Sequence, residues 1–260
     1  MKFGLIGHPI ARSLSPGLFK AAYDGKYPYD LIQGEDFEES YRRFLEEYDG
    51  INVTAPFKEL AYAKADVISE ECHLAKATNL LVKTPEGIKA YNSDFLGVRM
   101  WLKEVSGKKA LIVGTGGAGK AAAAAAVSVG MECVLMNRDM GRAEKLQESL
   151  KEMGHESTVR PIDDFCSCFA DADVIIYNIP AAIPQIGELT EADLANGRKN
   201  ILEANYKDPS FGDDFIARMK AVNPLAEYTG GRTWLLYQAL TGYEIFTGEM
   251  PDLERMSSVL

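Results

Sequence analysis

The segment VGTGGAGKAAAAAA fits two different phosphate-binding patterns at the same time. Gly114, Gly116 and Gly119 form G-x-G-x-x-G, the fingerprint of a dinucleotide-binding turn. Gly114, Gly119 and Lys120 also form G-x-x-x-x-G-K, which is most of the P-loop that binds nucleoside triphosphates. The first pattern predicts hydride chemistry with a nicotinamide cofactor, and the second predicts phosphoryl transfer.

The residue after Lys120 decides between these two patterns. A P-loop has serine or threonine there because the hydroxyl group ligates Mg²⁺, whereas this chain has Ala121. The dinucleotide pattern meets its own conditions, since an apolar strand over 109–114 precedes it and an alanine-rich helix over 118–129 follows it. The helix N-terminus would supply partial positive charge to a pyrophosphate. We therefore expect a dinucleotide site, with an ordinary tight strand-to-helix turn as the alternative.

The residues after the next predicted strand indicate which dinucleotide is bound. An NAD site usually has a carboxylate there, about 20 residues beyond the glycines, to bind the ribose hydroxyls. This chain has Asn137 and Arg138, and Arg142 follows one helical turn later. Guanidinium groups can pair with the 2′-phosphate of NADP. The sequence therefore favours NADP, although Asp139 would weaken phosphate binding and the arginines could simply be solvated charges.

Three polar segments in the first hundred residues follow or precede predicted elements where a ligand would lie. In open α/β sheets, ligands bind beyond the carboxyl ends of the strands. Taken singly, Ser15 and Asp94 could be helix N-caps, and Lys58 could be a surface lysine. Together, hydroxyls, amides, one lysine and one aspartate suit a small polyhydroxylated acid. These residues are Ser13 and Ser15 in GHPIARSLSP, Asn52, Thr54 and Lys58 in NVTAPFK, and Asn92 and Asp94 in YNSDFLG.

The elements that must position these residues alternate between strands and helices. This rhythm predicts an α/β fold with two domains. We expect a substrate domain over 1–105 plus 230–260, and an NAD(P)-binding Rossmann domain over 106–229. The expected strands are 2–7, 29–34, 50–54, 109–114, 131–138, 172–180 and 199–206, with a hairpin over 77–84 and 88–92. The first expected helix begins at Ser15, and the other expected helices cover 37–48, 94–105, 118–129, 141–153 and 230–248.

The composition excludes several classes of protein. A formal net charge of -10 argues against a nucleic-acid surface, which requires clustered lysine and arginine. No segment approaches the roughly 20 apolar residues of a membrane span. The four cysteines and three histidines form no metal-ligand spacing, so we expect free thiols and no metal. We expect a cytoplasmic enzyme that acts as a monomer or homodimer on a small-molecule substrate.

Seven ordered segments resemble the motifs of the shikimate dehydrogenase family. NVTAPFK matches the family motif N-V-T-x-P-x-K in full, and the other segments match in part. The resemblance covers nearly the whole chain in the family's order, which makes it far more specific than any single motif. The matching segments are GHPIARSLSP, NVTAPFK, ATNLL, YNSDFLG, GTGGAGKA, NRDMGRA and LLYQAL.

The resemblance implies reversible reduction of 3-dehydroshikimate to shikimate with NADP(H), in a cleft between the two domains. Lys58 matches the family's catalytic lysine, which exchanges a proton with the substrate oxygen. Asp94 matches the aspartate that orients this lysine and holds a substrate hydroxyl. The implied substrate-binding residues are Ser13, Ser15, Asn52, Thr54, Asn79, Asn92, Tyr206 and Gln238. The implied cofactor-binding residues are Gly114, Thr115, Gly116, Gly117, Ala118, Gly119, Asn137, Arg138, Arg142, Asn178 and Gly231.

The chain departs from the family motifs mainly on the cofactor side. Asp139 replaces the threonine of the N-R-T motif, and the segments 178–184 and 231–234 differ from the family pattern. Arg12 and Leu80 replace a histidine and a threonine in two other motifs. These departures leave open a quinate/shikimate dehydrogenase or a divergent paralogue. A non-catalytic dinucleotide sensor is the alternative from another class, although it would not need Lys58 and Asp94.

Overall fold

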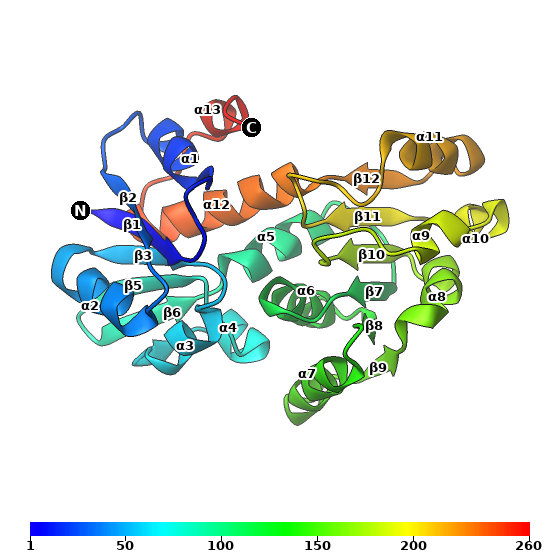
Figure 1. Ribbon diagram of the computed structural model, residues 1–260, viewed down its shortest axis with the longest axis horizontal. Helices are drawn as coiled ribbons and strands as arrows, with labels where there is room; N and C mark the ends of the chain where they lie inside the picture. Colours follow the sequence, from blue (N-terminus) through cyan, green and yellow to red (C-terminus); the bar gives the residue numbers. More distant parts are fainter. The chain divides into compact units, whose positions relative to one another are not determined.

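The computed structural model describes residues 1–260, and the chain divides into two compact units (Figure 1). The first unit consists of Met1–Gly97 and Leu236–Leu260, and the second consists of Val98–Leu235. Each unit contains one six-stranded sheet, which confirms the expected two-domain α/β fold. The divisions fall inside two helices, α5 (Ser93–Leu102) and α12 (Gly231–Thr247).

The sheet of the first unit mixes parallel and antiparallel strands in the order β2-β1-β3-β5-β6-β4. Strand β1 pairs in parallel with both β2 and β3. Strands β5 and β6 form the antiparallel hairpin that the sequence predicts. The strands are β1 (Phe3–Gly7), β2 (Tyr29–Gln33), β3 (Gly50–Val53), β4 (Val67–Ile68), β5 (Leu80–Thr84) and β6 (Gly87–Tyr91).

The helices of the first unit cover an apolar core on this sheet. Helix α2 buries Phe37, Tyr41 and Phe44 on one face, at the helical spacing visible in the sequence. The side chain of Asp36 caps this helix by accepting a hydrogen bond from the backbone N–H of Glu39 (2.8 Å). Besides α5 and α12, the helices are α1 (Ser15–Ala22), α2 (Phe37–Glu47), α3 (Lys58–Ala63), α4 (Glu70–Ala75) and α13 (Leu253–Ser257).

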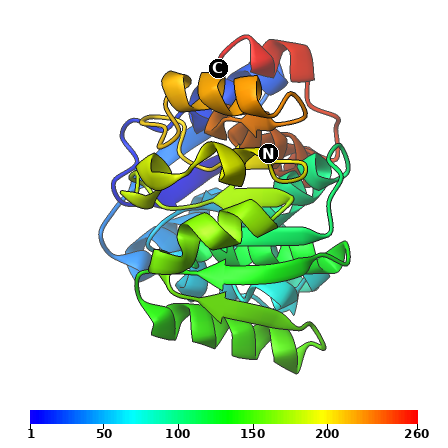
Figure 2. The ribbon, with the colours of Figure 1, turned by 90° about the vertical axis from the view of Figure 1, so that its right-hand side faces the viewer.

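The sheet of the second unit is entirely parallel and has the order β12-β11-β10-β7-β8-β9 (Figure 2). From β7 the chain builds outward to β9 on one side and then to β12 on the other. This is the order of a doubly wound dinucleotide-binding sheet, and its direction reverses between β7 and β10. The strands are β7 (Lys109–Val113), β8 (Glu132–Met136), β9 (Ser157–Arg160), β10 (Val174–Tyr177), β11 (Asn200–Glu203) and β12 (Glu227–Thr229).

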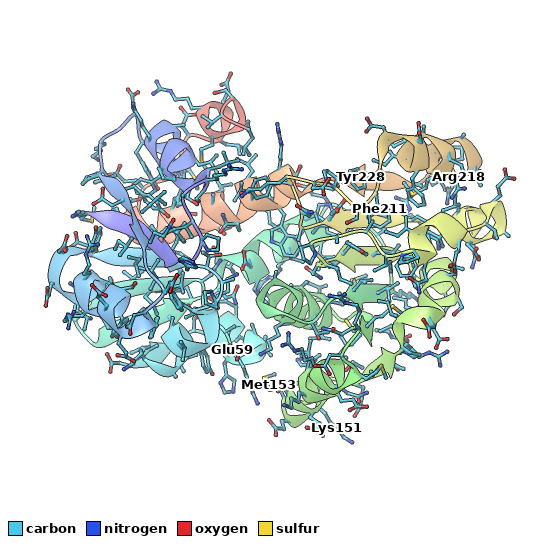
Figure 3. All side chains as sticks on the ribbon, in the orientation of Figure 1. Glu59, Lys151, Met153, Phe211, Arg218 and Tyr228 are labelled. Atoms are coloured by element: carbon cyan, nitrogen blue, oxygen red, sulfur yellow. The ribbon has the colours of Figure 1, made fainter.

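Small and aromatic side chains form much of the core of the second unit. Helix α6 (Gly117–Ser128) packs on β7, β8 and β10, and its six alanines from 121 to 126 are fully buried. The ring of Phe211 packs on the rings of both Tyr177 and Tyr228, and Figure 3 shows Phe211 and Tyr228 close together. The remaining elements are α7 (Met140–Glu152), η1 (Ile162–Asp164), α8 (Phe165–Asp171), α9 (Gln185–Glu188), α10 (Glu191–Ala195) and α11 (Asp213–Val222).

None of these helices is both long and apolar enough to cross a membrane. The four cysteines, at positions 72, 133, 166 and 168, are free thiols.

Candidate active site

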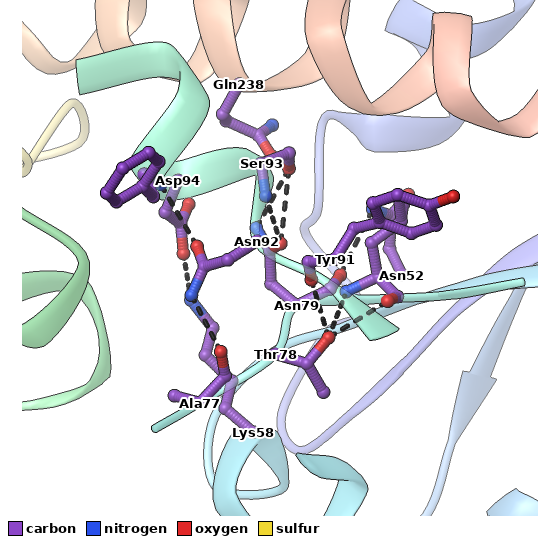
Figure 4. Close-up of polar contacts among 12 residues, drawn as sticks. Asn52, Lys58, Ala77, Thr78, Asn79, Tyr91, Asn92, Ser93, Asp94 and Gln238 are labelled. Atoms are coloured by element: carbon purple, nitrogen blue, oxygen red, sulfur yellow. Dashed lines mark hydrogen bonds and ion pairs between the residues drawn. The ribbon is translucent and has the colours of Figure 1, made fainter. Parts of the chain in front are cut away.

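Lys58 and Asp94 form an ion pair in the first unit (Figure 4). Lys58 is the first residue of α3, and its ammonium group donates a hydrogen bond to Oδ2 of Asp94 in the first turn of α5. The two side chains are only 16% and 14% exposed. An ammonium group beside a carboxylate, both mostly shielded from water, can exchange a proton with a bound oxygen.

A short connection, anchored at both ends, joins β3 to Lys58. At the end of β3, the N–H of Val53 donates to the backbone carbonyl of Asn79 (2.8 Å), and the N–H of Thr54 donates to that of Ile6 (3.0 Å). The ring of Phe57, which is 3% exposed, packs on Phe37 in the core. Lys58 therefore follows an anchored segment, which argues against a freely moving surface lysine.

Asn92 caps helix α5. Its side-chain oxygen accepts a hydrogen bond from the N–H of Phe95 (3.0 Å), and its amide nitrogen donates to the backbone carbonyl of Ala77 (2.9 Å). Asn92 is 1% exposed, and it ties this helix to the preceding loop. The alternative that Asp94 is the N-cap does not hold, because Asn92 caps the helix and Asp94 pairs with Lys58.

Hydrogen bonds hold the side-chain amide of Asn52 at both ends. Its Nδ2, in β3, donates to the backbone carbonyl of Asn79 (3.3 Å), and its Oδ1 accepts from the hydroxyl of Tyr29 (2.7 Å). Burial raises the pKa of Tyr29 well above its usual range, so this phenol stays protonated and acts as the donor.

Ser93 lies between the side chains of Asn79 and Gln238 (Figure 4). Nδ2 of Asn79 donates to its hydroxyl (3.0 Å), and the hydroxyl donates to Oε1 of Gln238 (3.0 Å). The sequence reasoning names neither Ser93 nor Tyr29. A signal was present for Ser93, because it stands inside the YNSDFLG motif between two named residues. Tyr29 lies in an ordinary strand and gives no such signal.

Ser13 and Ser15 lie together in the connection between β1 and α1. The hydroxyl of Ser13 donates to that of Ser15 (3.1 Å), and the carbonyl of Ser15 accepts from the hydroxyl of Tyr243 (3.1 Å) in α12. The N-cap of α1 is Leu14, and no side chain caps this helix. The expectation that Ser15 could be an N-cap is therefore wrong, and both hydroxyls remain candidates for ligand binding.

Tyr206 belongs to the second unit, in the loop that follows β11. Burial raises the pKa of its phenol. The neighbouring Asn205 shapes this loop, because its side-chain oxygen accepts from the N–H groups of Lys207 (3.2 Å) and Asp208 (3.3 Å). Asn205 also donates to the carbonyl of Pro180 (3.1 Å), which joins this loop to the one after β10.

The three glycines after β7 have three distinct structural roles. Gly114 has φ +91°, a left-handed conformation that favours glycine. At Gly119, a Cβ would lie 1.9 Å from the carbonyl oxygen of Gly114, so only glycine lets α6 start this close to the strand. At Gly116, a Cβ would meet no atom of the chain within 4 Å. The space beside Gly116 is where a dinucleotide fingerprint admits the pyrophosphate.

The surroundings of the glycine turn fit the same ligand. Gly117 and Ala118 form the first turn of α6, where helical N–H groups have no partner within the helix. Asn178 follows β10 and contacts Gly114, and its buried side-chain oxygen has no hydrogen-bond partner. Asn137 donates to the hydroxyl of Thr115 (2.7 Å), which fixes the end of β8 against the turn.

Arg138 and Arg142 are exposed after β8, where the sequence predicts a phosphate site. Arg142 forms an ion pair with Asp139, in which Nε of the arginine lies 3.5 Å from the carboxylate. Gly231, which the resemblance assigns to cofactor binding, has a packing reason of its own. A Cβ there would lie 2.5 Å from the carbonyl oxygen of Ala204.

The parallel sheet and its glycine turn define the second unit as a dinucleotide-binding domain, and the first unit adds a lysine–aspartate pair suited to proton transfer. Family models identify the two regions further. The model for the "Shikimate dehydrogenase substrate binding domain" matches residues 5–81, and the model for "Shikimate / quinate 5-dehydrogenase" matches residues 98–202.

Full-length relatives agree with these matches. The chain is 30% identical to the shikimate dehydrogenase (NADP(+)) of Acinetobacter baumannii, over 97% of this chain and 98% of the relative. It is 25% identical to that of Carboxydothermus hydrogenoformans, over 99% of this chain and 95% of the relative. The structure of a shikimate 5-dehydrogenase from Mycobacterium fortuitum has a TM-score of 0.84 at 28% identity, covering 100% of this chain and 97% of that one. The chain belongs to the shikimate dehydrogenase family.

Proposed function

We propose that this chain is an NADP-dependent shikimate dehydrogenase, which reversibly reduces 3-dehydroshikimate to shikimate. The observation that carries the proposal is the Lys58–Asp94 ion pair, whose two side chains are mostly shielded from water. A dinucleotide sensor would have no use for a shielded proton-transfer pair. The relatives of this chain are named shikimate dehydrogenase (NADP(+)), which supports the proposal.

Lys58 would manage the proton of the reaction. During reduction, its ammonium group donates one proton to the carbonyl oxygen of 3-dehydroshikimate, while the carbonyl carbon receives a hydride. In the oxidation of shikimate, the neutral amine accepts the proton of the same hydroxyl group. Asp94 holds the ammonium group in place by its ion pair and offers a carboxylate oxygen to a substrate hydroxyl.

The remaining polar residues would bind the ring and its carboxylate. The hydroxyls of Ser13 and Ser15 suit the carboxylate, since both can donate hydrogen bonds. We leave Asn92 out of this set because both of its polar groups bond to the backbone. The proposed ring-binding residues are Asn52, Thr54, Asn79, Gln238 and, from the second unit, Tyr206.

The residues of the second unit fit NADP(H). The open space beside Gly116 and the start of α6 suit the pyrophosphate, and Arg138 and Arg142 suit the 2′-phosphate. Bound NADPH would supply the hydride. Asn178 and Asn137 would shape the turn, since each lies against it.

The proposal also covers the domain bounds, the cellular location and the oligomeric state of the enzyme. We propose that residues 1–105 with 230–260 form the substrate domain and that 106–229 form the cofactor domain. The division of contacts into two units supports this assignment, because the Lys58 pair and the glycine turn fall in different units. We also propose a cytoplasmic enzyme that is a monomer or homodimer and acts on a small molecule.

The test is to mix the purified protein with shikimate or quinate and with NADP⁺ or NAD⁺, and to follow the absorbance of the reduced nicotinamide. We expect turnover with shikimate and NADP⁺ at a higher kcat/KM than with any other pair. Preference for quinate would overturn the substrate assignment and identify a quinate dehydrogenase. Binding of NADP⁺ without turnover of either acid would overturn the enzymatic assignment and favour the sensor.

A further inference from the structure

We propose that Ser93 is a positioning residue that sets the orientation of the two substrate-binding amides, Asn79 and Gln238. The inference rests on the proposed function, because it concerns the same site. Ser93 is fully buried and is absent from the residues that the family resemblance assigns. It acts on the ligand only through its two neighbours.

Ser93 contacts both ends of the Asn79 amide. Its backbone N–H donates to Oδ1 of Asn79 (2.7 Å), and its hydroxyl accepts from Nδ2 of the same side chain (3.0 Å). A donor at the oxygen end and an acceptor at the nitrogen end permit only one of the two flipped amide orientations. Asn79 is 4% exposed, so water has little access to either end.

The one hydroxyl hydrogen of Ser93 fixes the orientation of Gln238. Its two acceptors within reach are Oε1 of Gln238 at 3.0 Å and Oδ1 of Asn79 at 3.3 Å. Oδ1 of Asn79 already accepts the shorter bond from the Ser93 backbone, so the hydroxyl hydrogen points to Gln238. The hydroxyl thus accepts a hydrogen bond from Nδ2 of Asn79 and donates one to Oε1 of Gln238. These two bonds determine which end of each amide faces Ser93.

Two glycines hold Ser93 close enough to Gln238 for this contact. A Cβ at Gly97 in α5 would lie 2.7 Å from the backbone nitrogen of Gln238. A Cβ at Gly242 in α12 would lie 3.1 Å from both Cβ and Oγ of Ser93. A side chain at Gly97 would force the two backbones apart, and one at Gly242 would displace Ser93 by a few tenths of an ångström. The hydrogen bond between Ser93 and Gln238 therefore depends on close backbone packing rather than on a flexible reach.

The test compares Ser93→Ala with Ser93→Thr and with a control, Ser40→Ala. Alanine removes the hydroxyl, and threonine keeps it. Ser40 is also buried, at 3% exposure, but its hydroxyl donates only to the backbone carbonyl of Asp36 (2.9 Å) in α2. The measurements are KM and kcat with shikimate and NADP⁺, the shikimate Kd by calorimetry, and thermal unfolding.

We expect Ser93→Ala to raise the shikimate KM and Kd by about tenfold, the loss of one oriented hydrogen bond, with kcat and the NADP⁺ KM within about threefold. Ser93→Thr should restore KM and Kd to within about twofold, and Ser40→Ala should leave them unchanged. A folded Ser93→Ala protein with an unchanged shikimate Kd overturns the inference, and so does an equal loss of binding in Ser40→Ala.

Two further controls keep the result interpretable. If Ser93→Ala does not fold, Ser93→Cys fills the same space with a weak donor and acceptor, and the same rise in KM and Kd is expected. An unaltered protein that does not turn over shikimate contradicts the proposed function, and this is established before any variant is made. An active unaltered protein with an unaffected Ser93 variant contradicts only the role of Ser93.

Discussion

At the scale of single residues, the removal of Lys58, the proposed proton donor, is the most direct test of the site. Its ammonium group is the shielded donor beside Asp94. We expect Lys58→Ala to lower kcat by about 10²- to 10⁴-fold, the usual contribution of a positioned acid–base group, with a much smaller rise in KM. Steady-state kinetics measure both quantities. Lys64→Ala is the control, because Lys64 is exposed and pairs with Glu38 on the surface. An unchanged kcat in Lys58→Ala would refute its role.

Asp139 lies beside Arg142, one of the two arginines that we propose bind the cofactor's 2′-phosphate. Its carboxylate lies 3.5 Å from Nε of Arg142, and both side chains are mostly exposed. We expect Asp139→Thr to tighten NADP⁺ binding by about 1.4- to fivefold, since interactions between exposed charges have energies of only about 0.2–1 kcal/mol. NAD⁺ binding should change little, because NAD⁺ has no 2′-phosphate.

Titration calorimetry at low and high salt measures this effect of Asp139. The gain should shrink as salt rises, because screening weakens interactions between exposed charges. Glu148→Gln is the matched control, since it removes the same charge from an exposed position on the same helix. Equal tightening in both variants would show a general charge effect and contradict a specific role for Asp139.

Individual site residues were predictable from the sequence only where local motifs name them. Lys58 and Asp94 stand in recognisable segments, and the structure pairs them across 36 positions of sequence. The roles of Asn92 and Ser93 were not predictable, because adjacent polar residues in one motif look alike. Only the fold shows that Asn92 caps α5 and that Ser93 contacts Gln238, 145 positions away.

At the scale of elements, we expect two glycines of the turn between β7 and α6 to have different roles: Gly119 in folding and Gly116 in cofactor binding. We expect Gly119→Ala to destabilise the protein by about 1–3 kcal/mol, because the added Cβ would overlap the carbonyl oxygen of Gly114. Alanine's better helix propensity offsets at most about 1 kcal/mol of this cost. We expect Gly116→Ala to leave stability unchanged and to weaken NADP⁺ binding by at least about tenfold, since its methyl would occupy the approach to the pyrophosphate.

Urea unfolding and NADP⁺ titration of the two glycine variants measure these outcomes. Gly116 has φ −75° and ψ −168°, extended backbone that alanine adopts readily, so the prediction for folding does not depend on strain. A Gly116→Ala protein with full NADP⁺ affinity would show that the open space beside this residue does not receive the cofactor.

The elements that could be predicted from sequence have strong local patterns. Strand β7 is a continuous apolar run that enters a glycine turn, and the structure has it where expected. The sequence patterns do not predict the strands β4, β9 and β12 or the helices α3, α4, α8, α9, α10, α11 and α13. Six-residue helices are too short to show a helical period, and β9 alternates between half-buried and exposed positions at one edge of its sheet. Pairing with neighbouring strands stabilises such edge strands, and this information is not local.

At the scale of the whole molecule, each unit buries a free thiol, and we expect the two thiols to make the stability of the fold sensitive to alkaline pH. Burial raises the pKa of Cys72 in the first unit and of Cys133 in the second to about 12, from an ordinary value of 9.0. Between these values the unfolded chain has released the thiol protons and the folded chain has kept them. The free energy of unfolding therefore falls as pH rises from 9 toward 12, by up to about 1.4 kcal/mol per pH unit for each thiol.

Urea unfolding at steps of pH from 7 to 11 measures this loss of stability. Between pH 9 and 10 the thiols dominate, because the buried phenols of Tyr23 and Tyr177 begin from an ordinary pKa of 10.0 and are raised to about 12. We expect a flat profile up to about pH 8, a fall that begins near pH 9, and a steeper fall above pH 10 as the phenols contribute. Cys133→Ala should be less stable at pH 7, because it leaves a small cavity, but it should lose less stability between pH 9 and 10 than the unaltered chain. A variant with the same slope over that interval would show that the Cys133 thiol does not couple folding to pH.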